Sequence, residues 1–286
     1  MKRSRLPSIT IRQRELIVYV YKYRYLTHGQ LKQFLKIKNT AALDRWLADL
    51  QTKQYIYGLE VPSFDQKSVG VIYCIGKNGL SFARNRYRTI AEQSIDPLLR
   101  MDINKRGMDS KRTNTFMRSC VLLADCVLAF LNTEARSVDA TVTITSKADY
   151  ICPDNPFNFL VDSIIMSQLG PQYCIESVDK NREPTTFKTY LLEVMSGTLP
   201  RYRIRARIDR YCRYLQEGSW EWEREGPQPI VLLICPNTEI LKYARNRAKT
   251  KLKMLWPDER NRIHIKFATR TDITTSGPLT PIWSEA

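Results

Sequence analysis

The chain has 286 residues, of which 43% are hydrophobic and 26% are charged, a soluble composition with enough apolar material for two domains. Its net charge of +16 is uneven, at +11 over residues 1–100, −2 over 101–200 and +7 over 201–286. Basic residues interleaved with Tyr and Trp in helical patterns favour nucleic acid as partner, because an anionic membrane favours a segment with one clean apolar face. A basic surface kept for solubility is the alternative.

The cysteines, histidines and hydropathy indicate a cytoplasmic protein. Seven cysteines without a Cys-x-x-Cys pair, and only two histidines, give no zinc site of the usual spacing. Thiols of this kind suit a reducing compartment. The basic N-terminus lacks the apolar region of a signal peptide, and we see no stretch of about eighteen apolar residues. We therefore expect no membrane partner.

Three short helices open the chain. The first begins at Thr10 and repeats apolar residues at three- and four-residue steps. Thr27 and Gln30 form a capping-box pattern for the second. Asn39 caps the third, which carries an apolar stripe of Leu43, Trp46, Leu47 and Leu50. Two β-rich runs follow, Tyr55–Val61 and Val69–Ile75, and the second is expected to end at Lys77-Asn78-Gly79.

This order of helices and hairpin predicts a winged helix-turn-helix over residues 1–88. A winged helix used only for protein contacts is the alternative. In a DNA complex, Thr40 and Arg45 of the third helix would contact bases. The phosphate contacts would come from Arg3, Arg5, Arg12, Arg14, Lys53 and Lys67. Asp44 and Asp49 on the third helix repel phosphate, which predicts narrow or weak base recognition.

The next segment, residues 89–112, is charged and weakly periodic, and we interpret it as a linker. An amphipathic helix over Thr115–Leu131, with Asn114 as a possible cap, is then expected to open a second domain over residues 113–286. Strands are predicted at Ala140–Thr145, Phe159–Met166, Tyr190–Met195, Ile230–Ile234 and Ile263–Ala268, and helices at Tyr202–Gln216 and Glu239–Trp256. The overall fold class is thus α+β or α/β, with a mixed sheet in the second domain.

Four pieces of this second domain carry a family resemblance. They are an apolar strand containing Asp162, the segment Leu192–Thr198 with Glu193 and Gly197, the helical segment Arg207–Tyr211, and the strand Ile230–Ile234. With the N-terminal elements they resemble the replication-relaxation family of mobile-element proteins. The resemblance implies a winged helix joined to a domain similar to the PD-(D/E)XK nuclease fold.

Two departures from the family pattern bear on catalysis. Where the family has an acid two residues after the Glu, this chain has Met195, and where it has a helical Lys, this chain has Arg207. An active nuclease would use Asp162 and Glu193 as catalytic acids that hold Mg²⁺, the one cofactor implied. A thioether binds no hard cation, and a permanently charged guanidinium cannot act as a base. We therefore favour a vestigial acid pair that binds Arg205 or Arg207, without cofactor or metal.

Two basic helices in this domain favour phosphate binding. The segment 201–213 holds six arginines, and apolar Ile204, Ile208, Tyr211 and Leu215 recur at helical spacing on one face. The cations expected to contact DNA are Arg203, Arg205, Arg207 and Arg210 on this helix, and Arg245, Arg247 and Lys249 on the next. A solvated charged face is the alternative.

These features give three functional hypotheses. The first is a DNA-binding protein of a plasmid or integrative mobile element, acting in replication, mobilisation or control of the element's genes with a degenerate nuclease-like domain. The second is an active Mg²⁺-dependent nuclease, and the third is a transcription regulator with a C-terminal dimerisation domain. Double-stranded DNA is the expected partner in each, with other mobile-element or replication proteins and a second copy of the chain as further possibilities.

Overall fold

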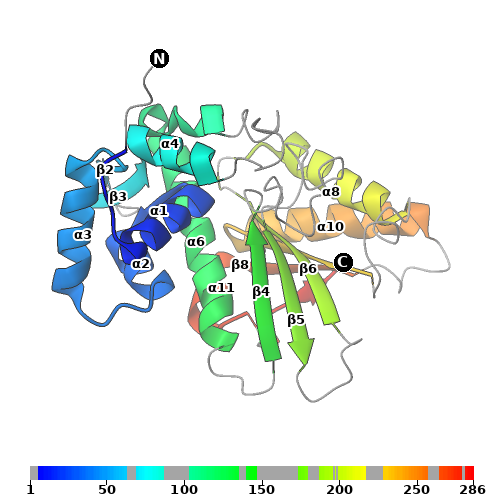
Figure 1. Ribbon diagram of the computed structural model, residues 1–286. Helices are drawn as coiled ribbons and strands as arrows, with labels where there is room; N and C mark the ends of the chain where they lie inside the picture. The colour runs from blue at the N-terminus through cyan, green and yellow to red at the C-terminus, as the bar shows by residue number, and fades with distance from the viewer. Residues whose placement is uncertain are drawn as a thin grey trace, which may run out of the picture. The chain divides into compact units, whose positions relative to one another are not determined.

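A computed structural model describes residues 6–62, 69–86, 103–134, 140–146, 173–179, 187–195, 197, 199–216, 228–256, 264–278 and 281–286. The chain divides into two compact units, the first covering Met1–Leu128 and the second most of residues 129–286. Both units combine helices with a β-sheet, so the protein has a mixed α and β fold (Figure 1).

The first unit contains the predicted three helices and hairpin, in the predicted order. Its elements are α1 (Ile11–Tyr23), β1 (Tyr25–Thr27), α2 (His28–Phe34), α3 (Thr40–Thr52), β2 (Ile56–Pro62), β3 (Val69–Ile75), α4 (Lys77–Arg86), the 3-10 turn η1 (Asp109–Lys111) and the first part of α6 (Asn114–Glu134). The predicted caps are confirmed: Thr27 and Gln30 form a complete capping box, and the Asn39 side chain accepts from the Ala42 amide.

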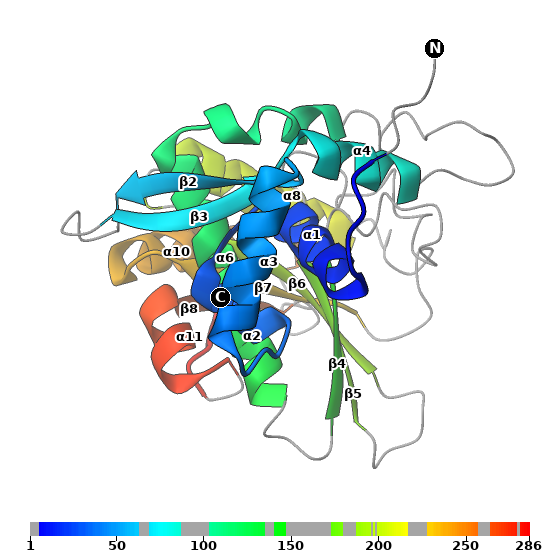
Figure 2. The same ribbon diagram turned by 60° about the vertical axis from the view of Figure 1, so that its left-hand side comes forward.

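A three-stranded antiparallel sheet completes this unit. Strand β3 lies between β1 and β2, and Figure 2 shows β2 and β3 side by side. Strand β1 has only three residues and was not predicted. Strand β3 ends at Ile75, as expected before Lys77-Asn78-Gly79, but helix α4, which these three residues begin, was not predicted. A glycine is required at position 79 because a Cβ there would lie 2.2 Å from the backbone oxygen of Tyr55.

The C-terminal part of the predicted linker is packed in the first unit. Asp109 is fully buried, and its carboxylate accepts hydrogen bonds from the Nε and Nη2 atoms of Arg24. Its backbone oxygen accepts from the Tyr25 hydroxyl at 2.6 Å. Arg106, 5% exposed, donates to the backbone oxygen of Tyr21, and Ile103 is fully buried. Residues 103–112 therefore belong to the first unit rather than to a free linker, since Ile103, Arg106 and Asp109 are buried in it.

Helix α6 was expected to open the second domain, but its first turns pack in the first unit. Thr113, rather than Asn114, caps the helix by accepting from the Phe116 amide at 3.4 Å. The Gln30 side-chain amide donates to the Val121 oxygen at 2.8 Å and to the Asp125 carboxylate at 2.6 Å. One amide side chain thus joins the capping box of α2 to α6. The physical reason for the difference is that apolar periodicity shows that a face is buried, but not against which partner.

By length and composition, Asn114–Asn132 could cross a membrane, with a mean hydropathy of 1.5. No such stretch was expected from the sequence. The helix carries two charged residues that are bonded within the first unit: Arg118 donates to the Pro62 oxygen at 3.0 and 2.5 Å, and Asp125 accepts from Gln30. Met117, Ala124 and Val127 are buried. Of this span 39% is buried, and a single helix of this length and composition is weak evidence for a membrane span.

The second unit contains a mixed sheet with strand order β4-β5-β6-β7-β8-β9 among the described strands. The pairs β6–β7 and β7–β8 are parallel and the others antiparallel. The elements are β4 (Ala140–Ser146), β5 (Tyr173–Asp179), β6 (Phe187–Val194), α8 (Arg201–Gln216), β7 (Ile230–Cys235), α10 (Thr238–Leu255), β8 (Ile265–Thr269), α11 (Arg270–Ser276) and β9 (Ser284–Glu285). The mixed sheet, four predicted strands and both basic helices are confirmed, and the predicted strand Phe159–Met166 lies outside the described residues.

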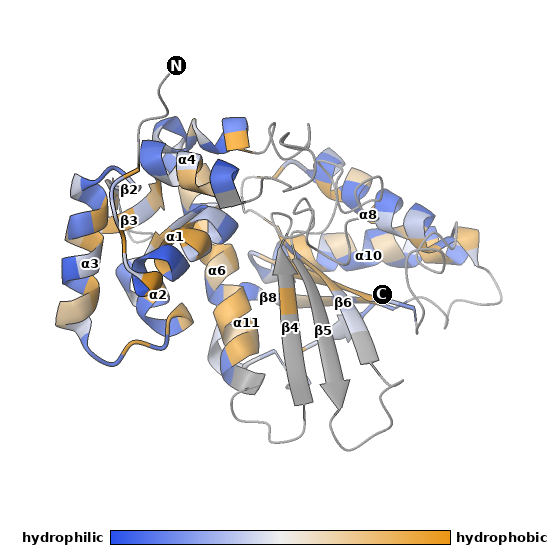
Figure 3. Cartoon of the chain, in the orientation of Figure 1, coloured by the Kyte–Doolittle hydropathy of each residue, from blue (hydrophilic) through white to orange (hydrophobic). Residues whose placement is uncertain are grey.

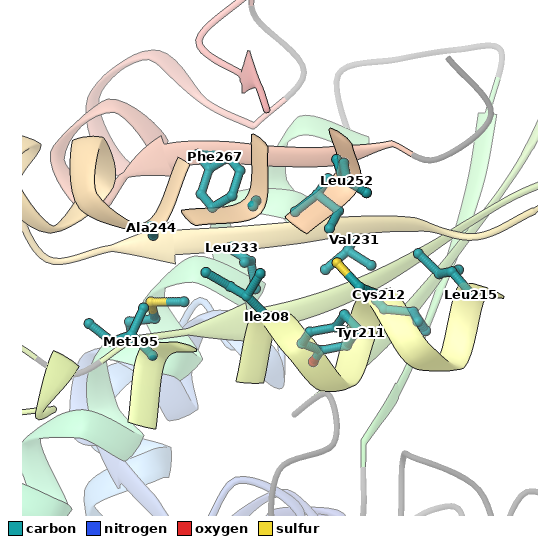
Figure 4. Close-up of a cluster of buried hydrophobic side chains, with 14 of the residues drawn as sticks. Met195, Ile208, Tyr211, Cys212, Leu215, Val231, Leu233, Ala244, Leu252 and Phe267 are labelled. Carbon is teal, nitrogen blue, oxygen red and sulfur yellow. The ribbon is translucent and has the colours of Figure 1, made fainter. Parts of the chain in front are cut away.

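Helices α8 and α10 cover one face of this sheet. Each joins two neighbouring parallel strands, and their apolar side chains share one core cluster with alternate residues of the strands (Figure 4). The strand members have odd numbers because successive side chains point to opposite faces. They are Leu191 on β6 and Met195 just after it, Val231, Leu233 and Cys235 on β7, and Ile265 and Phe267 on β8. The predicted inward stripe of α8 is confirmed, with Ile204, Ile208, Tyr211 and Leu215 all buried.

Candidate nucleic-acid interface and the acid at its base

Glu193 lies beneath α8 in the second unit. It has the same strand parity as Leu191 and Met195, so its side chain points to the helix-covered face. The side chain is 2% exposed. Its Oε1 atom accepts from Nη1 of Arg207, and its Oε2 atom accepts from the Tyr211 hydroxyl at 2.9 Å. Of the two arginines expected to bind the acid pair, Arg205 and Arg207, the structure pairs Arg207 with Glu193.

Burial shifts the pKa values of both partners of Glu193. It raises the pKa of Tyr211 above its ordinary value of 10.0, so the phenol stays neutral and donates to the carboxylate. It lowers the pKa of Arg207 below its ordinary value, although a guanidinium remains charged at physiological pH. The carboxylate therefore meets one permanent cation and one neutral donor in a site with little water.

This donor set does not fit a Mg²⁺ ion. Both carboxylate oxygens of Glu193 already accept hydrogen bonds, and Met195, two residues further on, is 2% exposed in the apolar core. Mg²⁺ takes oxygen ligands in a near-octahedral arrangement and keeps several waters. Within the described part of the chain, no group of three or more His, Cys, Asp or Glu residues could hold a metal. The other predicted acid, Asp162, lies outside the described residues.

The outer faces of α8 and α10 form one basic surface. The two helices lie side by side, bridged by the ion pairs Arg201–Glu239 at 2.9 Å and Arg247–Asp209 at 3.4 Å. Figure 3 shows hydrophilic and hydrophobic residues alternating along both. We call the exposed cations the α8–α10 surface; they are Arg201, Arg203, Arg205, Arg210, Arg213, Lys242, Arg245, Lys249 and Lys253.

The only acids on these two helices are Asp209 and Glu239, and both already form the bridging ion pairs. The predicted phosphate-binding residues therefore fall into two groups. Arg203, Arg205, Arg210, Arg245 and Lys249 are exposed. Arg207 and Arg247 are partly buried and are used inside the fold. Sequence periodicity separated the apolar face of α8 from its charged faces, but it could not identify these internal pairs.

In the first unit, the predicted DNA-contacting residues also differ in their surroundings. Thr40 and Arg45 are exposed on α3, where Thr40 accepts from Lys32 at 3.1 Å and Arg45 donates to the Ala41 oxygen of its own helix. Arg14 is exposed, and Arg12 pairs with Glu15 at 2.9 Å. Arg3, Arg5 and Lys67 lie outside the described residues.

Lys53 has a structural role that the sequence did not reveal. Its ammonium donates to the Asp49 carboxylate at 2.8 Å and to the Ser8 backbone oxygen at 2.9 Å. The Tyr55 hydroxyl donates to the Pro7 oxygen at 2.6 Å, which fixes the segment before α1 against the end of α3. An open pocket of about 570 Å³ lies between the N-terminal segment and α3. It is lined by Ser8, Ile9, Thr10, Gln13, Arg45, Trp46, Asp49 and Lys53. Trp46, expected in the inward stripe, is only partly buried at this pocket.

Comparison of the chain with protein-family models, with curated proteins and with solved structures finds no match. The resemblance to the replication-relaxation family therefore rests on the chain's own residues, chiefly Glu193, Gly197 and the helical segment Arg207–Tyr211.

Proposed function

We propose that this protein binds double-stranded DNA through its N-terminal unit. Its C-terminal unit binds the phosphates of the DNA backbone without cleaving the strand. The absence of cleavage is inferred from the environment of Glu193, whose two carboxylate oxygens accept hydrogen bonds from Arg207 and Tyr211. A metal-dependent nuclease requires a carboxylate that faces its ion and the scissile phosphate. The α8–α10 surface, in contrast, has the composition of a phosphate-binding face.

The order of elements in the first unit supports a winged helix-turn-helix. Helices α1, α2 and α3 precede the β2–β3 hairpin, which would be the wing. The exposed side chains of α3 include Thr40 and Arg45, which could reach base edges. Asp44 on the same helix pairs with His28 at 2.8 Å. An acid held by a neighbouring residue repels phosphate less than an unpaired one would.

The biological setting is proposed from the sequence. The family resemblance supports a protein encoded by a plasmid or integrative element, with a role in replication, DNA mobilisation or control of the element's genes, and the cysteine pattern favours the cytoplasm. In this proposal the winged helix selects a site, and the C-terminal unit, as a nuclease-like domain without cleavage activity, adds affinity that depends on charge.

Fluorescence anisotropy with a labelled DNA duplex over a series of salt concentrations tests the proposal. Affinity should fall linearly with salt on logarithmic axes, by a slope of about 0.9 for each phosphate that the protein neutralises. Replacing Lys249 and Lys253 of α10 by Ala keeps the helix and removes two exposed cations. The slope should then become shallower by about 0.9 for each phosphate that the variant no longer neutralises. The matched control replaces Lys105 and Lys111, two exposed lysines of the first unit.

The control variant should keep the slope of the unmodified protein. Equal slopes for all three proteins would remove the α8–α10 surface from the DNA interface. Failure to bind any duplex at low salt would reject the proposal as a whole.

A further inference from the structure

We propose that the N-terminal end of the α8–α10 surface binds single-stranded DNA by stacking an unpaired base on Tyr202. The inference rests on the proposed function, because it assigns a nucleic-acid class to the α8–α10 surface. It goes beyond phosphate contact, since a base can be recognised there only if it has left the duplex.

Tyr202 stands out among the aromatic residues of α8. Its neighbours Tyr211 and Tyr214 are buried at 0% and 8% exposure, whereas Tyr202 is 62% exposed. It lies in the first turn of the helix, on the outward face. Surfaces that bind single-stranded nucleic acid combine basic side chains with aromatic rings on which bases stack, and an exposed ring on a basic helix provides both.

The surroundings of Tyr202 leave room for a base and supply charge for its phosphates. The residues three and four positions along the helix, Arg205 and Ala206, share its face. Ala206 projects little beyond the backbone, and Arg205 is exposed. Arg203 donates to the Tyr202 hydroxyl at 3.3 Å, with its guanidinium 6.0 Å from the ring centroid.

A second arginine–aromatic contact lies close by. The guanidinium of Arg201 is 5.2 Å from the ring centroid of Tyr243 on α10, and the Tyr243 hydroxyl donates to the Arg201 oxygen at 3.4 Å. Cation–π contact of this kind orders an arginine side chain that would otherwise be mobile. The end of the surface therefore presents one exposed ring with Arg201, Arg203 and Arg205 around it.

A protein surface that combines aromatic rings with basic side chains can distinguish single-stranded DNA from duplex DNA. In a duplex the faces of the bases are stacked on each other, and only base edges and phosphates are exposed to a protein surface. In a single strand each base has a free face, and stacking on an aromatic side chain contributes about 1–3 kcal/mol per base. Tyr202 should therefore add affinity for single strands and none for duplexes.

The test compares three labelled probes of equal length with the full chain by anisotropy: oligothymidylate, an abasic strand of the same backbone, and a duplex. The variants are Tyr202→Ala, and Tyr202→Phe as the matched control that keeps the ring. Tyr202→Ala should weaken oligothymidylate binding about 5- to 150-fold, the range that corresponds to this stacking energy. Binding of the abasic strand and the duplex should be unchanged, and Tyr202→Phe should behave as the unmodified protein. Because Tyr202 is exposed, thermal unfolding should show equal stability for all three proteins.

The outcomes separate this inference from the proposed function. Normal duplex binding with no effect of Tyr202→Ala on oligothymidylate would overturn the inference and leave the proposed function standing. Equal binding of the abasic strand and oligothymidylate by the unmodified protein would overturn it too. Absence of binding to all three probes would overturn both.

Discussion

The guanidinium of Arg207 donates a hydrogen bond to the carboxylate of Glu193 beneath helix α8. The hydroxyl of Tyr211, one turn further along the same helix, donates to the other oxygen of that carboxylate. A single acid at the end of an apolar strand is thus a partner of the arginine helix that follows it. This pairing joins β6 to α8 through charge as well as through apolar packing.

Removing Arg207 should strongly destabilise the protein. In Arg207→Ala, the carboxylate of Glu193 stays buried without its cation, which costs about 3–5 kcal/mol of the free energy of unfolding. Chemical denaturation measures this loss. The double variant Glu193→Gln with Arg207→Met removes both charges and should regain most of the loss. Arg213→Ala, at an exposed position of the same helix, is the control and should change stability by no more than about 0.5 kcal/mol.

Asp109 should be as important for the first unit. It is fully buried and binds Arg24 through both side-chain oxygens, so Asp109→Ala leaves a partly buried guanidinium unpaired and should cost about 3 kcal/mol. The matched control is Asp44→Ala, whose side chain is 59% exposed beside His28, with an expected loss below about 1 kcal/mol. Equal, small losses for both variants would show that residues 103–112 are not part of the folded unit.

Two glycines of the first unit give a steric test. A Cβ at Gly79 would lie 2.2 Å from the Tyr55 backbone oxygen, and backbone cannot move aside as a side chain can. Gly79→Ala should therefore cost at least about 1–3 kcal/mol. A Cβ at Gly70 meets nothing within 4 Å, so Gly70→Ala should be neutral or slightly stabilising. Thermal unfolding of the two variants measures these stability changes. A Gly79→Ala protein as stable as the unmodified one would contradict the close approach of α4 to the Tyr55 backbone.

Asp49 should give a small acid-dependent contribution to stability. The hydrogen bond from Lys53, followed by that from Gln13, lowers the pKa of this carboxyl below its ordinary value of 3.8. A lowered folded-state pKa stabilises the protein fully above 3.8 and progressively less as the pH falls through the folded value. The stability difference between the unmodified protein and Asp49→Asn should thus shrink on acidification below about pH 4. A difference that grows in acid would contradict the Lys53–Asp49 contact.

Much of the fold could be predicted because its signals are local. Thr27, Gln30 and Asn39 cap helices through side chains within three residues, and the periodicity of Ile204, Ile208 and Tyr211 gave the buried face of α8. Strand β5 has a polar Glu176-Ser177 pair within its run and was missed. Helix α4 was missed because Lys77-Asn78-Gly79 was interpreted only as the end of the preceding strand, whereas Gly79 is needed for a close backbone approach.

The candidate site was predictable in part. An arginine of α8 was expected to bind the acid at the end of β6, but the sequence left Arg205 and Arg207 as alternatives, and the structure shows that it is Arg207. The pairing of Arg247 with Asp209, and the anchoring of the N-terminal segment by Lys53, depend on which elements become neighbours. Neither segment alone carries a sequence signal that would predict such a pair. Tyr202 differs from its buried neighbours only in the direction in which it points, which becomes clear once the position of α8 on the sheet is known.

The central claim, DNA binding without cleavage, is tested most directly by incubating the protein with supercoiled plasmid and Mg²⁺ or Mn²⁺. Samples would be run on a gel before and after the protein is removed. The account predicts a retarded complex before removal and fully supercoiled plasmid afterwards. Nicked or linear plasmid made by the unmodified protein, and not by a Glu193→Gln variant that still retards the DNA, would contradict it.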